Sequence, residues 1–341
     1  MKATNKMRHA KFLLILVAVA GMQACHKSRV KSDPKPVNPI QTDAWKKVAS
    51  LPNGRIQVLE VLNNKLYAGS DSGVVYNSTD GITWAASNAI QPSNPITAIT
   101  VFNNIMFVGS ATNGIYMSTD GGKNWINNSP NFPKVSSFTV FNNTLYSASA
   151  AYSGIMEYDE AGNKWSAFVS NGLPTNYNLD VQKIIFFNNT LLSLQGENGN
   201  YYLFDKTTNY WTEKYFFNSY TPGLWANDII YDLGTLLAAY DNAIFISEDV
   251  GVNWSYDTIG LRRANLFNRR TIYAGRDKYY TIHNTGNAGI WLQRRDRLAV
   301  RGTTWATGEE YLSFGYSWAV RELNGMLFLA TDNGLYFRKI S

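Results

Sequence analysis

Tryptophans recur along this chain at nearly constant intervals, and each one closes a similar stretch of sequence. From Trp84 onward, successive repeat tryptophans are 41, 40, 46 and 43 residues apart. Before Trp84, an apolar run at 65–70 leads through a glycine to a second run at 74–76 and then to a polar turn at 78–83. Short apolar runs separated by Gly, Asn and Asp predict β-strands joined by turns. A period of about 40 residues with four such strands predicts a β-propeller with one blade per repeat.

The polar turns resemble the Asp-box, or BNR, repeat of sialidase-like propellers, whose pattern is Ser-x-Asp-x-Gly-x-Thr-Trp. Residues 118–125 fit best, and the copies that end at Trp165 and Trp211 keep the Asp and the Trp but lose the Ser. In such a turn the Asp accepts backbone N–H bonds, the Gly allows positive φ, and the Trp fills the space between sheets. The residues to which we assign this structural role, without metal binding, are Ser78, Asp80, Trp84, Ser118, Asp120, Gly122, Trp125, Ser247, Asp249, Gly251 and Trp254.

The two ends of the repeat region predict how the ring closes. The chain ends after three strand-like runs with no fourth, whereas residues 43–48 resemble the last strand of a repeat, with Trp45 standing 39 residues before Trp84. Pairing these ends removes two exposed sheet edges. We therefore predict an all-β fold: a single β-propeller over residues 43–341, with seven four-stranded blades closed by the N-terminal strand. A ring of six or eight blades remains an alternative, because the sequence of residues 269–305 follows the repeat pattern poorly.

The first 42 residues read as a targeting segment and a linker. Four basic residues precede the apolar run 12–20, which is too short to span a bilayer, and Cys25, the sole cysteine, follows. This resembles a bacterial lipoprotein signal, which implies removal of residues 1–24 and lipid attachment at Cys25, with membrane contact through that lipid. Residues 25–42 contain three prolines and are expected to form an extended tether. An ordinary signal peptide with an incidental cysteine is the alternative.

The net charge of +6 comes from the N-terminal segment. Residues 45–341 have no net charge, so the basic composition is no argument for a nucleic-acid partner. The residues that follow Cys25 are basic, whereas surface-exported lipoproteins of the Bacteroidetes type carry acidic residues there. We expect a lipid-anchored protein of the cell envelope, at an outer membrane and facing the periplasm or the cell surface, with the leaflet left open.

An enzyme of this kind would need residues that the sequence does not clearly supply. The propeller region has one histidine, His283, expected in a solvated loop, and no cysteine, so His- or Cys-dependent nucleophiles and a His-rich metal site are disfavoured. The sialidase Arg-Ile-Pro element is half matched by residues 55–57. We predict no catalytic residues, cofactor or metal. A glycoside hydrolase of exo-sialidase or endoglucanase type, using carboxylates on the loop face such as Asp228 and Asp232 or Glu309 and Glu310, is the alternative.

A role as a binding or assembly platform is favoured instead. Aromatic residues gather in the loops between successive blades, and residues 262–301 contain nine arginines against two acids. Arginine beside aromatic rings suits carboxylated ligands through bidentate bonds and stacking. The partner is then a glycan, peptide or protein, with an anionic one favoured. The competing interpretation is that several of these aromatic residues pack between blades and that the arginines are scattered on outer strands. The candidate ligand-binding residues are Arg262, Arg263, Tyr220, Trp225 and Tyr316.

Overall fold

The computed structural model describes ten segments of the chain: 45–129, 132–149, 154–174, 180–195, 200–216, 226–240, 243–257, 270–284, 290–296 and 309–340. They belong to one compact unit, Val37–Ser341. These segments consist of strands and turns without a helix. None of them contains a helix that could cross a membrane. The predicted signal peptide (1–24), the tether (25–42) and Cys25 lie outside the described residues.

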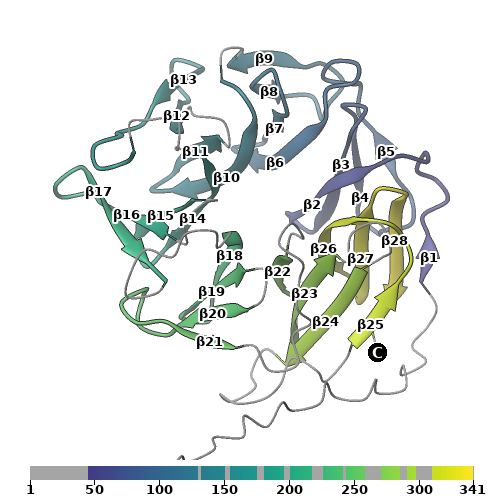
Figure 1. Cartoon of the computed structure of the whole chain (residues 1–341). Helices are drawn as coiled ribbons and strands as arrows, with labels where there is room; N and C mark the ends of the chain where they lie inside the picture. The colour runs from purple at the N-terminus through teal and green to yellow at the C-terminus, as the bar shows by residue number, and fades with distance from the viewer. Residues whose placement is uncertain are drawn as a thin grey trace, which may run out of the picture. The chain divides into compact units, whose positions relative to one another are not determined.

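Seven four-stranded antiparallel sheets are arranged in a ring (Figure 1), which confirms the predicted seven-bladed propeller. Blade 1 contains β2 (Ile56–Leu62), β3 (Lys65–Ser70), β4 (Val75–Ser78) and β5 (Ala85–Ala86); blade 2 contains β6 (Ile96–Phe102), β7 (Ile105–Ser110), β8 (Ile115–Ser118) and β9 (Ile126–Ser129). Blade 3 contains β10 (Val135–Phe141), β11 (Thr144–Ser149), β12 (Ile155–Asp159) and β13 (Lys164–Ala167); blade 4 contains β14 (Val181–Phe187), β15 (Thr190–Gln195), β16 (Asn200–Asp205) and β17 (Tyr210–Tyr215).

The remaining blades complete the ring. Blade 5 contains β18 (Ala226–Asp232), β19 (Thr235–Tyr240), β20 (Ile244–Ser247) and β21 (Ser255–Asp257); blade 6 contains β22 (Arg270–Ala274), β23 (Lys278–Asn284), β24 (Ile290–Asp296) and β25 (Glu309–Leu312). Blade 7 contains β26 (Ser317–Leu323), β27 (Met326–Thr331), β28 (Gly334–Lys339) and β1 (Lys46–Lys47). The irregular region after residue 269 therefore forms a complete blade, which excludes counts of six and eight.

The N-terminal strand closes the ring, as predicted. β1 pairs antiparallel with β28, Lys46 opposite Phe337 and Lys47 opposite Tyr336, and β1 lies beside the C-terminal blade in Figure 1. The backbone N–H of Val48 then donates to Leu335 O at 2.9 Å. Trp45 packs edge-on against Phe314 at 6.4 Å. The first and last parts of the chain thus share one sheet, and blade 7 keeps no unpaired outer edge at β28.

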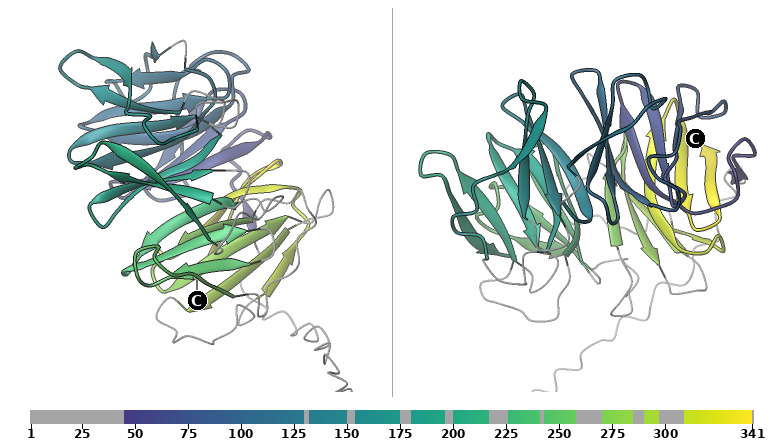
Figure 2. Two further views of the ribbon diagram at one scale, coloured as in Figure 1. Left: turned by 60° about the vertical axis from the view of Figure 1, so that its left-hand side comes forward. Right: turned by 90° about the horizontal axis from the view of Figure 1, so that it is seen from above.

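The strand directions give the ring two different faces, which we name by their connections. The turn face carries the tight turns between the first and second and between the third and fourth strands of each blade. The loop face carries the other connections. The first-to-second turns are mostly Asn-Asn pairs with both residues at positive φ, such as Asn63 (51°) and Asn64 (56°). The amide of Asn324 in blade 7 donates to Thr79 O in blade 1 at 2.9 Å, so both kinds of turn share one face. The side-on view of Figure 2 (right) shows the antiparallel strands running between the two faces.

The Ser-x-Asp turns between third and fourth strands are held by short-range hydrogen bonds. The hydroxyl of Ser78 donates to Asp80 Oδ1 at 2.9 Å, and the same oxygen accepts the backbone N–H groups of Ile82 and Thr83 at 2.8 and 2.7 Å. The N–H of Gly81 donates to the Ser78 hydroxyl at 2.7 Å. These donors hold the pKa of the Asp80 carboxyl at about 2. The turns that contain Asp120 and Asp249 repeat the pattern.

The core lies between neighbouring blades rather than in one central cluster. The second strand of each blade is almost fully buried, as in β3, β7, β15, β19 and β27. The repeat tryptophans fill the space between sheets. Trp211, for example, is fully buried and donates its indole N–H to Val169 O at 2.8 Å, and Trp254 donates to the hydroxyl of Tyr201 in the preceding blade at 3.0 Å. The innermost strand of each blade faces a central channel.

Candidate functional site

The channel begins, at the loop face, with a β-bulge that recurs around the ring. In six of the seven blades the pairing of the innermost strand slips by one residue near its start, for example between Ile56 and Val58. The extra residue of a bulge is left out of the ladder, so its side chain can be aimed elsewhere. The six bulge residues are Gln57, Thr97, Ser136, Gln182, Asn227 and Trp318, and we call them the bulge ring.

All six bulge-ring residues line one cavity of about 830 Å³ that forms the channel. Two of them tie successive blades together: Gln57 Nε2 donates to Ile96 O at 2.8 Å, and the Ser136 hydroxyl donates to Val181 O at 2.5 Å. The hydroxyl of Thr97 is buried and has no hydrogen-bond partner among the described residues. Five of the six are uncharged polar residues, so this end of the channel can exchange hydrogen bonds with a neutral polar ligand.

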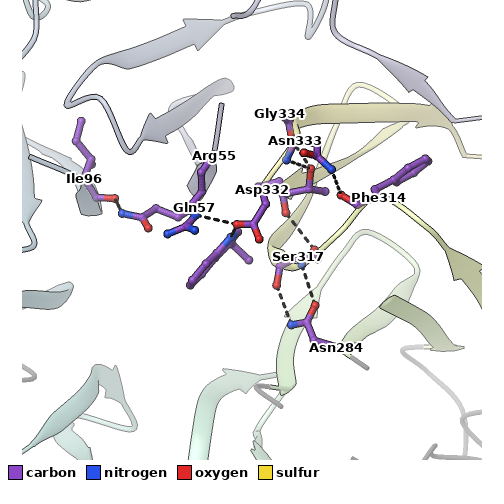
Figure 3. Close-up of polar contacts among 12 residues, drawn as sticks. Arg55, Gln57, Ile96, Asn284, Phe314, Ser317, Asp332, Asn333 and Gly334 are labelled. Carbon is purple, nitrogen blue, oxygen red and sulfur yellow. Dashed lines mark hydrogen bonds and ion pairs between the residues drawn. The ribbon is translucent and has the colours of Figure 1, made fainter. Parts of the chain in front are cut away.

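A charged cluster stands on one side of this opening, at the seam between blades 1 and 7. Arg55 Nε donates to Asp332 Oδ1 at 2.7 Å (Figure 3). The indole N–H of Trp318 donates to the same oxygen at 2.9 Å. The guanidinium carbon of Arg55 lies 5.2 Å from the centre of the Trp318 ring, and Tyr316 packs against that ring at 4.9 Å. We call Arg55, Tyr316, Trp318 and Asp332 the mouth cluster.

The mouth cluster fixes the direction of the Arg55 side chain. Its Nε donates to Asp332 and its guanidinium carbon lies over the Trp318 ring, while no described residue accepts a hydrogen bond from its two terminal nitrogens. The side chain of Arg55 is 44% exposed. A guanidinium held in this way presents a preorganised pair of N–H groups, which suits bidentate binding of a carboxylate.

Deeper in the channel the charged groups are paired across blades. Lys183 and Asp228 form an ion pair at 2.5 Å, and Asp228 also accepts the backbone N–H of Ile272 at 3.1 Å. The guanidinium of Arg321 contacts Glu60 at 2.9 Å and lies 5.0 Å from the ring centre of Tyr273. These pairs join blades 4 to 5 and 7 to 1, so they hold neighbouring blades together. Arg55 is therefore the charged group best placed to meet a ligand.

The residues predicted for ligand binding have different outcomes. Tyr316 lies in the mouth cluster, on the loop face as expected. The other four, Arg262, Arg263, Tyr220 and Trp225, lie outside the described residues, as do five of the nine arginines of residues 262–301. Arg55, noted only for its partial match to a sialidase element, and the bulge ring were not predicted as binding residues. The sequence did contain a signal for the bulge ring, because the second residue of most innermost strands is polar.

The acid pairs considered for catalysis do not form an evident catalytic site. Asp228 and Asp232 stand four residues apart on β18, which places their backbones about 13 Å apart. That spacing exceeds the range of about 5–9.5 Å between the carboxyls of glycosidases. Asp232 accepts the hydroxyl of Tyr279 at 2.8 Å. Glu309 and Glu310 lie in strand β25. His283 is in β23 and is 1% exposed, so the expectation of a solvated loop histidine was wrong. The described segments contain no group of three or more His, Cys, Asp or Glu that could hold a metal.

Comparisons with known proteins agree with the fold. Residues 30–153 match the model of the DUF6242 beta propeller domain family. No curated protein matches the chain. The extracellular domain of BT4673 from B. thetaiotaomicron is similar in structure, with a TM-score of 0.63 and 14% identity over 87% of this chain and 40% of that one. YCF48 bound to D1 peptide gives a TM-score of 0.64 and 13% identity over 89% of this chain and 97% of that one. YCF48 from Cyanidioschyzon merolae gives a TM-score of 0.60 at 15% identity, with 87% and 98% covered.

These structures share the propeller architecture with this chain. The chain spans two fifths of the BT4673 domain, whereas it spans nearly the whole of YCF48. A propeller hosts many unrelated activities, so function has to be argued from the mouth of the channel.

Proposed function

We propose that this protein is an envelope-anchored binding platform that holds a carboxylate-bearing segment of a protein or peptide partner at the loop-face end of its channel. The observation that carries this proposal is the fixed guanidinium of Arg55, whose terminal N–H groups have no acceptor among the described residues. An arginine that is already oriented loses little side-chain entropy on binding, so its bidentate bonds contribute more fully to affinity.

The surroundings of Arg55 suit a short extended segment. The bulge ring supplies uncharged donors and acceptors for main-chain amide groups, and Tyr316 and Trp318 supply aromatic surface beside the charge. A cavity of about 830 Å³ can receive a few residues but not a folded domain. The partner would therefore insert a loop or a chain end, and the loops around the opening would contact the rest of it.

Two of the comparisons support a binding role for a propeller of this size. YCF48, which this chain matches over 97% of that protein's length, is seen bound to D1 peptide, and the BT4673 domain is extracellular. The Ser-x-Asp turns support the resemblance to Asp-box repeats, with box residues that maintain the blades. Arg262, Arg263, Tyr220 and Trp225 remain proposed contacts in the loops around the opening.

The anchor is proposed from the sequence alone: residues 1–24 are removed and Cys25 carries lipid, which places the protein in the cell envelope. Intact-mass measurement of protein from the membrane fraction should show both changes. Replacing Cys25 with Ser should release the protein from the membrane, and an equally processed, equally bound Cys25→Ser protein would contradict the anchor.

Peptides test the binding site. We would titrate the protein with mixed short peptides that carry Asp, Glu or a free C-terminus, and with the same peptides in amide form, and follow the Trp318 indole N–H by NMR. Binding of the carboxylate forms should weaken at least tenfold in Arg55→Gln, because two charge-assisted hydrogen bonds are lost. Lys123→Gln, an exposed charge change on the turn face, is the matched control and should bind normally.

Two results would contradict the proposed function. Equal affinity of Arg55→Gln and the native protein for every binding peptide would move the site away from the mouth cluster. Turnover of fluorogenic sialosides or β-glucans by the native protein would favour the glycoside hydrolase alternative. Competition by free sialic acid or glucuronic acid without turnover would point to an anionic glycan as the ligand.

A further inference from the structure

The turn face carries an unusual number of exposed apolar side chains. Nine large apolar residues are exposed in the part of the chain that the structure describes, and all nine lie in a turn of this face or within two residues of one. The nine are Ile82, Ile126, Val140, Phe186, Tyr210, Tyr231, Leu233, Val252 and Tyr256.

Four of these residues lie at or next to the turn-face ends of the innermost strands of blades 3 to 5. Val140, Phe186 and Tyr231 occupy the same place, the sixth position of the innermost strand, and are 39, 42 and 38% exposed. Phe186 packs on Phe141 of blade 3 at 5.2 Å, and Tyr231 packs on Phe187 of blade 4 at 5.4 Å. With Leu233 in the adjoining turn, they make up what we call the apolar arc.

Leu233 departs from the pattern of its own turn. Five other blades place asparagine at this position with positive φ, whereas Leu233 adopts a φ of 47° and is 63% exposed. A branched apolar residue is disfavoured in the left-handed region, and an exposed one gains little from packing. Such a costly choice at the end of an apolar arc indicates a use on the surface rather than in the fold.

The chain enters the ring on this same face. β28 runs from Gly334 at the loop face to Lys339 at the turn face, and β1 is antiparallel to it, so Trp45 lies at the turn-face end. Cys25 stands 20 residues before Trp45. A segment of 20 residues reaches at most about 70 Å when it is fully extended. A lipid at Cys25 would thus be joined to the ring through the turn-face end of β1.

We propose that the apolar arc rests on the lipid surface, so that the ring lies on the membrane with its channel mouth turned outward. The inference rests on the lipid anchor of the proposed function. Side chains such as Phe, Tyr and Leu partition into the interfacial region of a bilayer. The contact would be weak alone, but the tether makes it intramolecular and raises its effective concentration. The turn face carries exposed charges of both signs, among them Asp80, Asp120 and Lys123.

A fluorescent probe at two opposed positions tests the orientation. Lipidated protein carrying an environment-sensitive thiol probe at Leu233→Cys or Ser72→Cys would be reconstituted in phosphatidylcholine vesicles, the lipid on Cys25 being checked by mass. Ser72 is exposed in a loop-face connection of blade 1. The probe at 233 should shift to the blue and be quenched by a lipid-borne quencher, whereas the probe at 72 should be quenched only from the water.

A second set of variants separates contact from folding. With the probe at Val252→Cys, the pair Leu233→Asn and Phe186→Ser should lower lipid-borne quenching at least threefold, while Leu233→Asn alone should not lower the melting temperature, because asparagine fits this turn. Tyr256→Ser changes an exposed tyrosine that does not belong to the apolar arc, so it is the control and should leave quenching unchanged. Lipid on Cys25 with no lipid-borne quenching at 233 or 252 would overturn this inference alone. Absence of lipid on Cys25 would overturn the anchor and this inference together, leaving peptide binding at Arg55 untouched.

Discussion

Trp45 offers the most direct perturbation of ring closure. It precedes β1, the strand that completes blade 7, and it packs between Phe314 at 6.4 Å and the guanidinium of Arg338 at 4.9 Å. Arg338 itself is only 4% exposed. Replacing Trp45 with Ala would remove the ring that covers this arginine and the apolar contact with the loop before β26.

The expected loss can be worked from these contacts. Trp→Ala costs about 3–5 kcal/mol in a full core, and Trp45 is partly buried, so about 2 kcal/mol is reasonable. The lost cation–π contact adds about 0.5–1 kcal/mol. Unfolding a chain of about 300 residues has an entropy near 0.6 kcal/mol/K at the melting temperature, so about 3 kcal/mol corresponds to a decrease of about 5 °C. Lys46→Ala, an exposed change in the same strand, should shift it by less than about 1 °C.

Scanning calorimetry of soluble chains that begin at residue 43 would measure these shifts without the anchor. A chain that begins at residue 50 should melt still lower and associate more readily, because it loses β1 and the buried Val48 and exposes the edge of β28. An unchanged melting temperature, either in Trp45→Ala or in the chain that begins at residue 50, would mean that closure by the N-terminal strand contributes nothing to stability.

Three further predictions concern the turns and the channel. A Cβ on Gly81 (φ 77°) would come within 2.1 Å of the buried ring of Phe328, whereas one on Gly121 (φ 75°) would meet nothing within 4 Å. Chemical denaturation should therefore show that Gly81→Ala is less stable than Gly121→Ala by at least about 1 kcal/mol. Equal stabilities of the two variants would refute this. Because backbone donors lower the pKa of Asp80 to about 2, its stabilising effect should be complete above about pH 4 and disappear as the pH falls through 2. Melting curves of native protein and Asp80→Asn should therefore differ at neutral pH and converge near pH 2, and parallel curves would contradict this. Lys183→Met should leave Asp228 without its cation and lower the free energy of unfolding by about 1–3 kcal/mol. The double variant Lys183→Met with Asp228→Asn should recover part of that loss in a double-mutant cycle. A coupling energy of zero would exclude the pair as a stabilising contact.

The sequence alone determined the repeating architecture of this protein. Turn signals such as Asn63-Asn64 and Ser78-x-Asp80 are local, since their hydrogen bonds and φ values involve residues within a few positions of each other. The period of the tryptophans and the surplus strand at Trp45 then gave the blade count and the closure, both of which the pairing of β1 with β28 confirms. The location of Tyr316 on the loop face followed from the same order of strands.

The channel mouth was decided by tertiary structure. Arg55 and Asp332 are 277 positions apart, and Glu60 and Arg321 are 261 apart, so they meet only because the ring closes. The bulges that turn Gln57 and its equivalents into the cavity depend on a slip in pairing of one residue, which an apolar pattern does not record. Exposure of Leu233 in a turn where asparagine would fit likewise appears only once its backbone angle is known. Local hydrogen bonds and periodic burial can be predicted from the sequence because they require particular residues at fixed spacings. Contacts made by closing the ring depend on its geometry, which brings together residues that are far apart in the chain.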